Sequence, residues 1–348
     1  MKDVAAILQE ARAEGASDVH LAPASPGYRR LHGRLVSIPG LVLSAPSLEA
    51  WAATVLSPIA RQRLGERGDG EAALDGGPGI GRCRVSACRS ARGLTVVVRL
   101  LPQEPPSLAT LGAPATVRAL TERSSGLILL CGAVGSGKTT TAAAFLDTLN
   151  RRGGRHILTV EDPVEIVHPP VGGPVTQREV GRDAASMAEA LRASLRADPD
   201  VLLVGEARDA DTLELALQAA GTGHLVLATL HAGGAVAALD RVLDLFAPER
   251  RTGARESLSG CLAAVVHQRL VPAGGGGRVA WFSVLNGTPA VRAAIRDGRE
   301  RQLPALMDLG RRQGMLTPAE ALTLLRHEGR LDPAWAPGSE VPGREDDP

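Results

Sequence analysis

The segment GAVGSGKT, residues 132–139, has the residue types and the spacing of a phosphate-binding loop, GxxxxGK[ST]. It lies between an apolar run that predicts a strand and a periodic run that predicts a helix, as the motif requires. Glycines let backbone N–H groups wrap phosphates, and the amino end of the helix adds its positive dipole. The pattern therefore predicts a site for ATP with Mg²⁺, in which Lys138 reaches the β- and γ-phosphates and Thr139 binds the metal. The residues expected to contact the nucleotide are Gly132, Val134, Gly135, Ser136, Gly137, Lys138, Thr139 and Thr140.

Lys138 stands out by composition as well as by position. It and Lys2 are the only lysines among 39 basic residues. A lysine kept in so arginine-rich a chain suggests a position where a compact point charge is needed. The alternative is an ordinary glycine-rich turn from strand to helix, which the lysine does not favour.

Carboxylates follow two later predicted strands. The segment ILTVEDPVE, residues 157–165, places Glu161 and Asp162 at one strand end, and DPDVLLVGEARD, residues 198–209, places Glu206 just beyond another. Hydrolysis of a triphosphate needs a carboxylate that orients the attacking water. Glu206 stands where such an acid is expected, and Glu161 is a second catalytic candidate.

The metal needs ligands of its own. The residue before Glu206 is Gly205, where this kind of site usually has an acid, so we expect the metal to rely on Thr139, waters and the pair Glu161 and Asp162. Either Glu161 or Glu206 could instead be a helix cap or a surface charge.

Two histidines bracket a fourth apolar run, GTGHLVLATLH. His224 precedes the expected strand and His231 follows it. A histidine at a strand end can sense a γ-phosphate or relay its loss to a neighbouring element. The alternative for each is an ordinary core or surface histidine.

The predicted strands and helices around these residues follow an α/β pattern. Short apolar runs alternate with helix-period segments, as in a parallel sheet with crossover helices, and ligands of such sheets bind at the carboxyl ends of the strands. Asp183 is the expected cap of one crossover helix, and Ala273–Gly277 the expected turn between two later strands. The expected strands of the sheet are Leu127–Cys131, Ile157–Val160, Val201–Val204 and Leu225–Thr229.

The first part of the chain has a different pattern. Residues 1–100 predict a small α+β domain, and residues 101–114 contain four prolines and predict a linker. Residues 115–330 form the α/β domain, and 331–348 predict a disordered tail. Within the first domain, helices are expected around Val4–Leu8 and Leu48–Leu56, and strands at Val19–Leu21, Leu35–Ile38, Cys83–Ala87 and Leu94–Leu100.

Composition narrows the function classes. The net charge is +1 and aromatic residues make up 2% of the chain, which argues against a nucleic-acid partner. The four cysteines include no CxxC pair, so we expect reduced, mostly buried thiols. No apolar run reaches the roughly 18 residues that a membrane-spanning helix needs. Acids at Asp3, Glu10 and Glu14 do not fit a secretory leader, so a cytoplasmic location is expected.

At this point the chain resembles a known family, the secretion ATPases of type II secretion and type IV pili, and most closely the PilT-like pilus retraction ATPases. GASDVHL at residues 15–21 resembles the family's amino-terminal segment. The Walker A, Asp box, Walker B and His box follow in family order as GAVGSGKTTT, ILTVEDPVE, DPDVLLVGEARD and TGHLVLATLH. The resemblance implies a RecA-like P-loop ATPase domain, a smaller PAS-like amino-terminal domain and a homohexameric ring.

The resemblance also implies roles for residues. Glu206 would activate water, Glu161 and Asp162 would belong to the Asp box, and His224 and His231 to the His box. Arginines of the amino-terminal domain would close over the phosphates, and Arg92 and Arg99 match the family positions best. A planar guanidinium suits developing phosphate charge.

The carboxyl-terminal region bears on whether the ATPase would retract or assemble a filament. TPAVRAAIRD, residues 288–297, resembles the retraction family's AIRNLIRE segment; Arg292, Ile295 and Arg296 are kept, while Ala293, Ala294 and Asp297 differ. Retraction is therefore favoured over assembly, and the tetracysteine zinc site typical of assembly ATPases is missing. An accessory or assembly ATPase stays open as an alternative.

The resemblance implies partners too. It implies an inner-membrane pilus platform protein, an assembly ATPase of the same system and a peripheral location at the inner face of the cytoplasmic membrane. Alternatives of other classes are a nucleic-acid translocase and a non-catalytic nucleotide-binding ring module.

Overall fold

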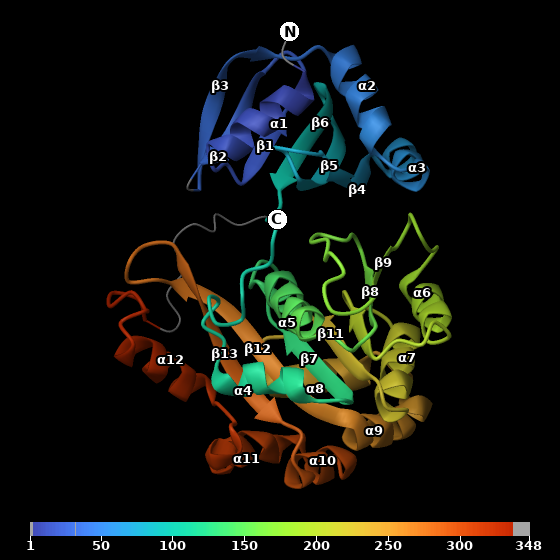
Figure 1. Ribbon diagram of the computed structural model, residues 1–348, viewed down its shortest axis with the longest axis vertical. Coiled ribbons are helices and arrows are strands. Elements are labelled where there is room, and N and C mark those ends of the chain that lie inside the picture. Colours follow the sequence, from blue (N-terminus) through green and yellow to red (C-terminus); the bar gives the residue numbers. More distant parts are fainter. Residues whose placement is uncertain (1–2, 32, 337–348) are drawn as a thin grey trace. The chain divides into compact units, whose positions relative to one another are not determined.

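The computed structural model describes residues 3–31 and 33–336. The chain divides into two compact units, each with its own sheet (Figure 1). The first comprises Met1–Glu104, Asp162–His168 and Glu179–Ala185, and the second comprises Pro105–Glu161, Pro169–Arg178 and Ser186–Pro348.

The first unit has a six-stranded antiparallel sheet of order β3-β2-β1-β6-β5-β4. Its elements are α1 (Val4–Ala13), β1 (Asp18–Leu21), β2 (Pro26–Leu31), β3 (Arg34–Val42), α2 (Ala45–Val55), α3 (Pro58–Arg67), β4 (Asp69–Asp75), β5 (Arg82–Ser90) and β6 (Gly93–Leu100).

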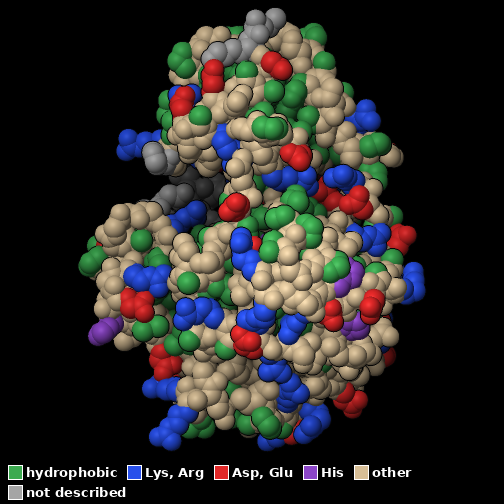
Figure 2. All heavy atoms as spheres, in the orientation of Figure 1, with side chains coloured by type: hydrophobic (Ala, Val, Ile, Leu, Met, Phe, Trp, Pro, Cys, Tyr) green, Lys and Arg blue, Asp and Glu red, His purple; other side chains and the backbone are tan. Residues whose placement is uncertain are grey.

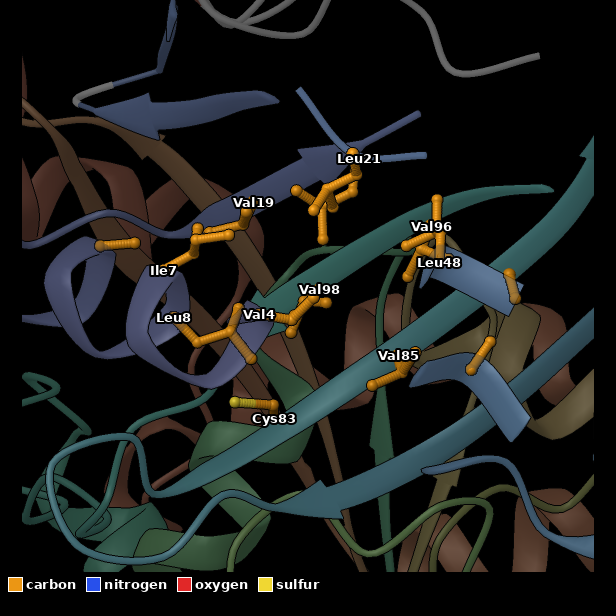
Figure 3. Close-up of a cluster of buried hydrophobic side chains, with 14 of the residues drawn as sticks. Val4, Ile7, Leu8, Val19, Leu21, Leu48, Cys83, Val85, Val96 and Val98 are labelled. Atoms are coloured by element: carbon orange, nitrogen blue, oxygen red, sulfur yellow. The ribbon is translucent and has the colours of Figure 1, made fainter. Parts of the chain in front are cut away.

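Alternating and helix-period apolar residues form the core of this unit. Val4, Ile7 and Leu8 lie on one face of α1 and point toward Val19 of β1 and Val98 of β6 (Figure 3). In β6, and in β5 as far as Ala87, every second residue is buried, as a half-covered sheet requires. The expected α+β class of this unit is therefore confirmed.

Three elements of the first unit escaped sequence analysis: α3, β2 and β4. The strand β4 has the sequence DGEAALD, and Asp and Gly are poor strand formers. It is a strand because all seven of its residues pair with β5. Pairing with a neighbour overrides local preference here.

The second unit is built on a seven-stranded sheet of order β13-β12-β7-β11-β10-β8-β9. The elements of the chain after the first unit are α4 (Ala115–Ala119), η1 (Leu120–Glu122), β7 (Gly126–Cys131), α5 (Lys138–Arg152), β8 (Ile157–Glu161), β9 (Val175–Glu179), α6 (Met187–Ser194), β10 (Val201–Val204), α7 (Ala210–Gly221), β11 (Leu225–Leu230), α8 (Ala235–Asp244), α9 (Pro248–Cys261), β12 (Leu262–Pro272), β13 (Arg278–Asn286), α10 (Pro289–Arg296), η2 (Glu300–Gln302), α11 (Leu303–Leu309), η3 (Gly310–Gln313) and α12 (Pro318–His327).

The central strands β12, β7, β11, β10 and β8 are parallel. All residues of β7, β8, β10 and β11 are buried, as expected for strands covered on both faces. Helix α5 contributes Phe145, Leu146 and Leu149 to the same core as Ile128 and Leu130 of β7. The α/β class and the four expected strands are confirmed.

The helix cap expected at Asp183 is wrong. Helix α6 begins after Ser186, whose Oγ accepts the backbone N–H of Glu189. The Asp183 carboxylate instead accepts the backbone N–H of Glu179, 2.9 Å away. Both residue types cap helices well, so local preference alone does not choose between them.

Parts of the expected linker and tail are packed. Leu108 and Ala113 belong to the core of the second unit. Leu331 and Trp335 are buried in a cluster with Trp281, in a segment for which the sequence predicted disorder. Residues 337–348, the rest of that tail, lie outside the described residues.

The cysteines in the described part of the chain are free thiols, with Cys83, Cys131 and Cys261 buried and Cys88 exposed. Burial raises the pKa of Cys131 to about 12 and that of Cys261 to about 11, so both thiols stay neutral. Among the described residues, none of the helices is both long enough and apolar enough to pass through a bilayer.

Candidate nucleotide site

The predicted phosphate loop connects β7 to α5 in the second unit. Its last glycine, Gly137, is the N-cap of α5 and has φ 88°, in the left-handed region that favours glycine. Helix α5 begins at the next residue, so its first N–H groups face the loop. The loop therefore has the backbone geometry that a phosphate group needs.

Lys138 is buried at the start of α5. Its Nζ donates to the carbonyl oxygens of Gly132 and Ala133, each 2.8 Å away. Neutral carbonyls are weaker partners for an ammonium group than an anionic phosphate. The arrangement fits a loop that exchanges these two bonds for phosphate contacts.

Pairing in the sheet brings the strand ends together. Val204 of β10 lies opposite Val160 of β8 and Ala228 of β11. The residues that follow, Glu161, Gly205 and Thr229, therefore lie side by side at the carboxyl edge. This confirms that the expected strands end at one edge.

Glu161 is buried at the end of β8. Its Oε1 accepts hydrogen bonds from Thr159, 2.7 Å away, and from Gln177 of β9, 3.1 Å away. Next to it, a Cβ added at Gly205 would lie 3.0 Å from the Cα of Glu161. That close packing explains why the residue before Glu206 is glycine rather than an acid.

Glu206 and His231 come together although they follow different strands. Oε1 of Glu206 lies 3.0 Å from Nε2 of His231, and Oε2 accepts from Nη2 of Arg208, 2.8 Å away. Burial alone would raise the pKa of Glu206. The Arg208 hydrogen bond and the charges of Arg208, His231 and Lys138 outweigh burial and lower that pKa below its usual range. Glu206 is therefore ionised at neutral pH.

Arg208 was not among the residues predicted for the site. The available signal was the basic residue two positions after Glu206, whose guanidinium reaches back to the Glu206 carboxylate.

Three other predicted site residues lie on other elements of the chain. His224 lies at the amino end of β11, roughly 20 Å along the strand from His231, with Nδ1 3.0 Å from the carbonyl of Ala219 in α7. Arg92 and Arg99 belong to the first unit. Arg92 is exposed, and Nε of Arg99 donates to Asp18, 2.9 Å away.

The Asp162 carboxyl is exposed, and Asp162 groups with the first unit. Within the described ranges, no group of three His, Cys, Asp or Glu side chains could hold a metal ion. A metal at this site therefore needs oxygen ligands beyond the protein carboxylates. The hydroxyl of Thr139, exposed on the first turn of α5, together with phosphate oxygens and waters, is a donor set that Mg²⁺ accepts.

Comparison with known proteins agrees with this geometry. The family model described as type II/IV secretion system protein matches residues 1–279. The chain is 42% identical to YggR of Escherichia coli over 315 residues, covering 90% of this chain and 95% of that protein. It is 39% identical to the type IV pilus retraction ATPase PilT of Pseudomonas aeruginosa over 317 residues, covering 90% and 91%.

Among solved structures, the chain resembles the pilus retraction motor PilT with bound ADP. The TM-score is 0.86 and the identity 38%, with 95% of each chain covered. Matching sequence, fold and length, together with an intact phosphate loop and an ionised acid at the strand edge, place this chain among ATPases. The chain belongs to the type II/IV secretion system protein family and is a PilT-like ATPase of that family.

Proposed function

We propose that this chain is a motor ATPase of a type IV pilus that hydrolyses MgATP to retract the filament. The observation that carries the proposal is the pairing of Glu206 with His231 at the sheet edge where the phosphate loop also begins. The similarity to PilT, whose solved structure contains ADP, supports a nucleotide as the ligand.

Each residue of the site has its own role in this proposal. Lys138 and the loop N–H groups hold the phosphates, and Thr139 helps to hold Mg²⁺. When bound, Mg²⁺ neutralises negative charge on the phosphates. Glu206 orients the attacking water and accepts its proton, and His231, bonded to Glu206, responds to loss of the γ-phosphate. The buried Glu161 supports the metal end of the site together with Asp162.

Two variants test this assignment. Lys138→Ala should abolish ATP binding, because the loop loses its phosphate charge. Glu206→Gln should keep ATP binding and lose turnover by at least about 100-fold, since an amide cannot take the water's proton. Calorimetric titration and steady-state hydrolysis measure the two effects, and circular dichroism checks folding. If Glu206→Gln hydrolyses ATP like the parent, another group activates water.

We further propose that the chain works as a homohexamer at the inner face of the cytoplasmic membrane. There it would act on an inner-membrane pilus platform protein, and an assembly ATPase of the same system would drive the reverse movement. The proposed domains are 1–100 and 115–330, with 101–114 as the linker that lets them close and reopen during turnover. Arg92 and Arg99 would then contact phosphate in the closed state. Multi-angle light scattering with ATP present measures the ring size.

The direction of movement has a cellular test. Loss of a retraction motor should leave cells with excess pili that do not retract, whereas loss of an assembly motor should leave bald cells. An accessory role is the nearest alternative, and it predicts that the deletion leaves cells with neither excess pili nor bald surfaces. Electron microscopy of a deletion strain, complemented with the parent and with Glu206→Gln, separates these outcomes.

The two alternatives of other classes have less support. Acidic and basic side chains are interspersed over the face seen in Figure 2, which does not favour a track for nucleic acid. A non-catalytic ring module does not need an ionised acid beside the phosphate loop. DNA-stimulated hydrolysis would revive the first alternative, and nucleotide binding without turnover by the parent would revive the second.

A further inference from the structure

Gln268 lies against the phosphate loop from a neighbouring strand. Strand β12 runs parallel to β7, and the register pairs His267 with Cys131. Gln268 follows His267 and Gly132 follows Cys131, so Gln268 and Gly132 are neighbours where the loop begins. Gln268 is 1% exposed, so its amide is enclosed at this point.

Gln268 contacts both ends of the glycine-rich turn. A Cβ placed on Gly132 would overlap the carbonyl oxygen of Gln268, and a Cβ placed on Gly137 would lie 2.8 Å from its Nε2. The strand backbone thus touches the first glycine of the loop, and the amide touches the last. These contacts reach the part of the loop whose backbone surrounds phosphates.

The amide oxygen of Gln268 has no hydrogen-bond partner among the described residues. An unpaired buried polar group destabilises a fold, and an apolar side chain of the same shape would avoid that cost. Ser136 of the same loop has a buried hydroxyl that likewise has no partner in the described structure. Two unsatisfied polar side chains at one loop indicate a function, because packing alone favours apolar residues here.

Lys138 connects these groups to nucleotide binding. Its Nζ holds the carbonyls of Gly132 and Ala133, which belong to the loop that Gln268 and Ser136 also contact. When Lys138 binds a phosphate instead, its hydrogen bonds to these two carbonyls break and the loop can rearrange. The hydroxyl of Ser136 and the amide of Gln268 can then pair with loop groups.

We propose that Gln268 is a positioning residue for the phosphates of a bound nucleoside di- or triphosphate, acting through the Gly132–Gly137 loop. The proposal rests on the proposed function, since it requires a phosphate ligand at this loop. Ligand binding supplies the hydrogen bonds that the ligand-free loop lacks, so removing the amide weakens binding more than it weakens the fold.

The test is Gln268→Met, which keeps the length of the side chain and removes the amide. We expect the Kd for ADP and for a non-hydrolysable ATP analogue to rise about tenfold, the effect of about one lost hydrogen bond. KM should rise in parallel, with kcat at saturation changed less than about threefold. The Tm of the ligand-free protein should stay level or rise. Gln302→Met, in the short helix η2, is the matched control and should change none of these.

A lower Tm with unchanged Kd would overturn the proposal and make Gln268 a packing residue. If the variant is less stable, the increase in Tm produced by saturating ADP still reports affinity, because ligand stabilisation depends on Kd. Lys138→Ala is titrated in the same series. If Lys138→Ala binds ADP like the parent, the proposed function fails; if only Gln268→Met does so, this inference alone fails.

Discussion

His231 and Glu206 form a contact of 3.0 Å between Nε2 and Oε1 across two parallel strands. His231 follows β11 and Glu206 follows β10, so the contact depends on the register that pairs these strands. A proton bound by one residue, or a phosphate placed beside it, changes the electrostatic potential at the other residue. The pair therefore links the acid that activates water to an element that can respond to hydrolysis.

His231→Gln should lower kcat by about 100-fold while the Kd for ADP stays within about threefold, because the variant keeps the loop and loses the imidazole at Glu206. His224→Gln is the matched control at the other end of β11. It should keep most of the turnover and lower the Tm slightly, since His224 bonds to Ala219 of α7. Equal loss of turnover in both variants would contradict this assignment and favour the family's joint role for the two histidines.

Arg208→Ala should move the acid limb of the pH profile of kcat/KM to higher pH. Burial would raise the pKa of Glu206, but the Arg208 hydrogen bond and the charges of Arg208, His231 and Lys138 outweigh burial and lower it. Glu206 must be ionised to act as a base. Without the guanidinium, protonation therefore begins at a higher pH as the solution is acidified. Arg326→Ala, on the exposed side of α12, should leave the profile unchanged. An unshifted acid limb in Arg208→Ala would show that another group sets it.

Stability should fall with acidification because of His267. Burial, with the charges of Arg269 and Lys138, lowers the pKa of His267 to about 4. The unfolded chain takes up this proton near pH 6.5 and the folded chain does not, so the free energy of unfolding decreases between those pH values, by up to about 3 kcal/mol. His267→Leu should flatten this dependence in urea titrations at pH 7, 5.5 and 4. His327→Leu should follow the parent.

Two arginines of the retraction-like segment should differ in their effect on folding. Arg292 donates to the carbonyls of Gly260, Leu262 and Gly287 at 2.8–2.9 Å, whereas Arg296 lies beside Asp297 at the surface. Arg292→Ala should therefore lower the free energy of unfolding by about 3 kcal/mol, and Arg296→Ala by less than about 0.5 kcal/mol. Equal stabilities in urea would contradict the anchoring role of Arg292.

Substitutions of two arginines in the first unit should differ in their effect on stability. Arg99 donates to the buried carboxylate of Asp18, so Arg99→Ala should lower the free energy of unfolding by about 1–2 kcal/mol, as well as turnover. Arg92 is exposed, and Arg92→Ala should lower turnover without changing stability. Unchanged turnover in Arg92→Ala would remove it from the nucleotide site.

The class of the fold and the position of the site can be predicted from local sequence patterns. Apolar runs followed by Gly132, Glu161 or Glu206 predict buried strands with a glycine or an acid at the carboxyl end. The apolar run and the residue that follows it are both local features of the sequence. Parallel pairing then brings such ends to one edge whatever the exact register. The residue types at that edge were therefore sufficient to predict phosphate chemistry.

Which residues contact one another depends on packing between distant segments. Asp183 and Ser186 are equally good caps by type, and Arg292 and Arg296 match the family segment equally well. Gln268 has no motif of its own, and its contact with Gly137 arises because β12 is inserted beside β7. Such contacts depend on register and packing between distant segments, and no local pattern of residues encodes them.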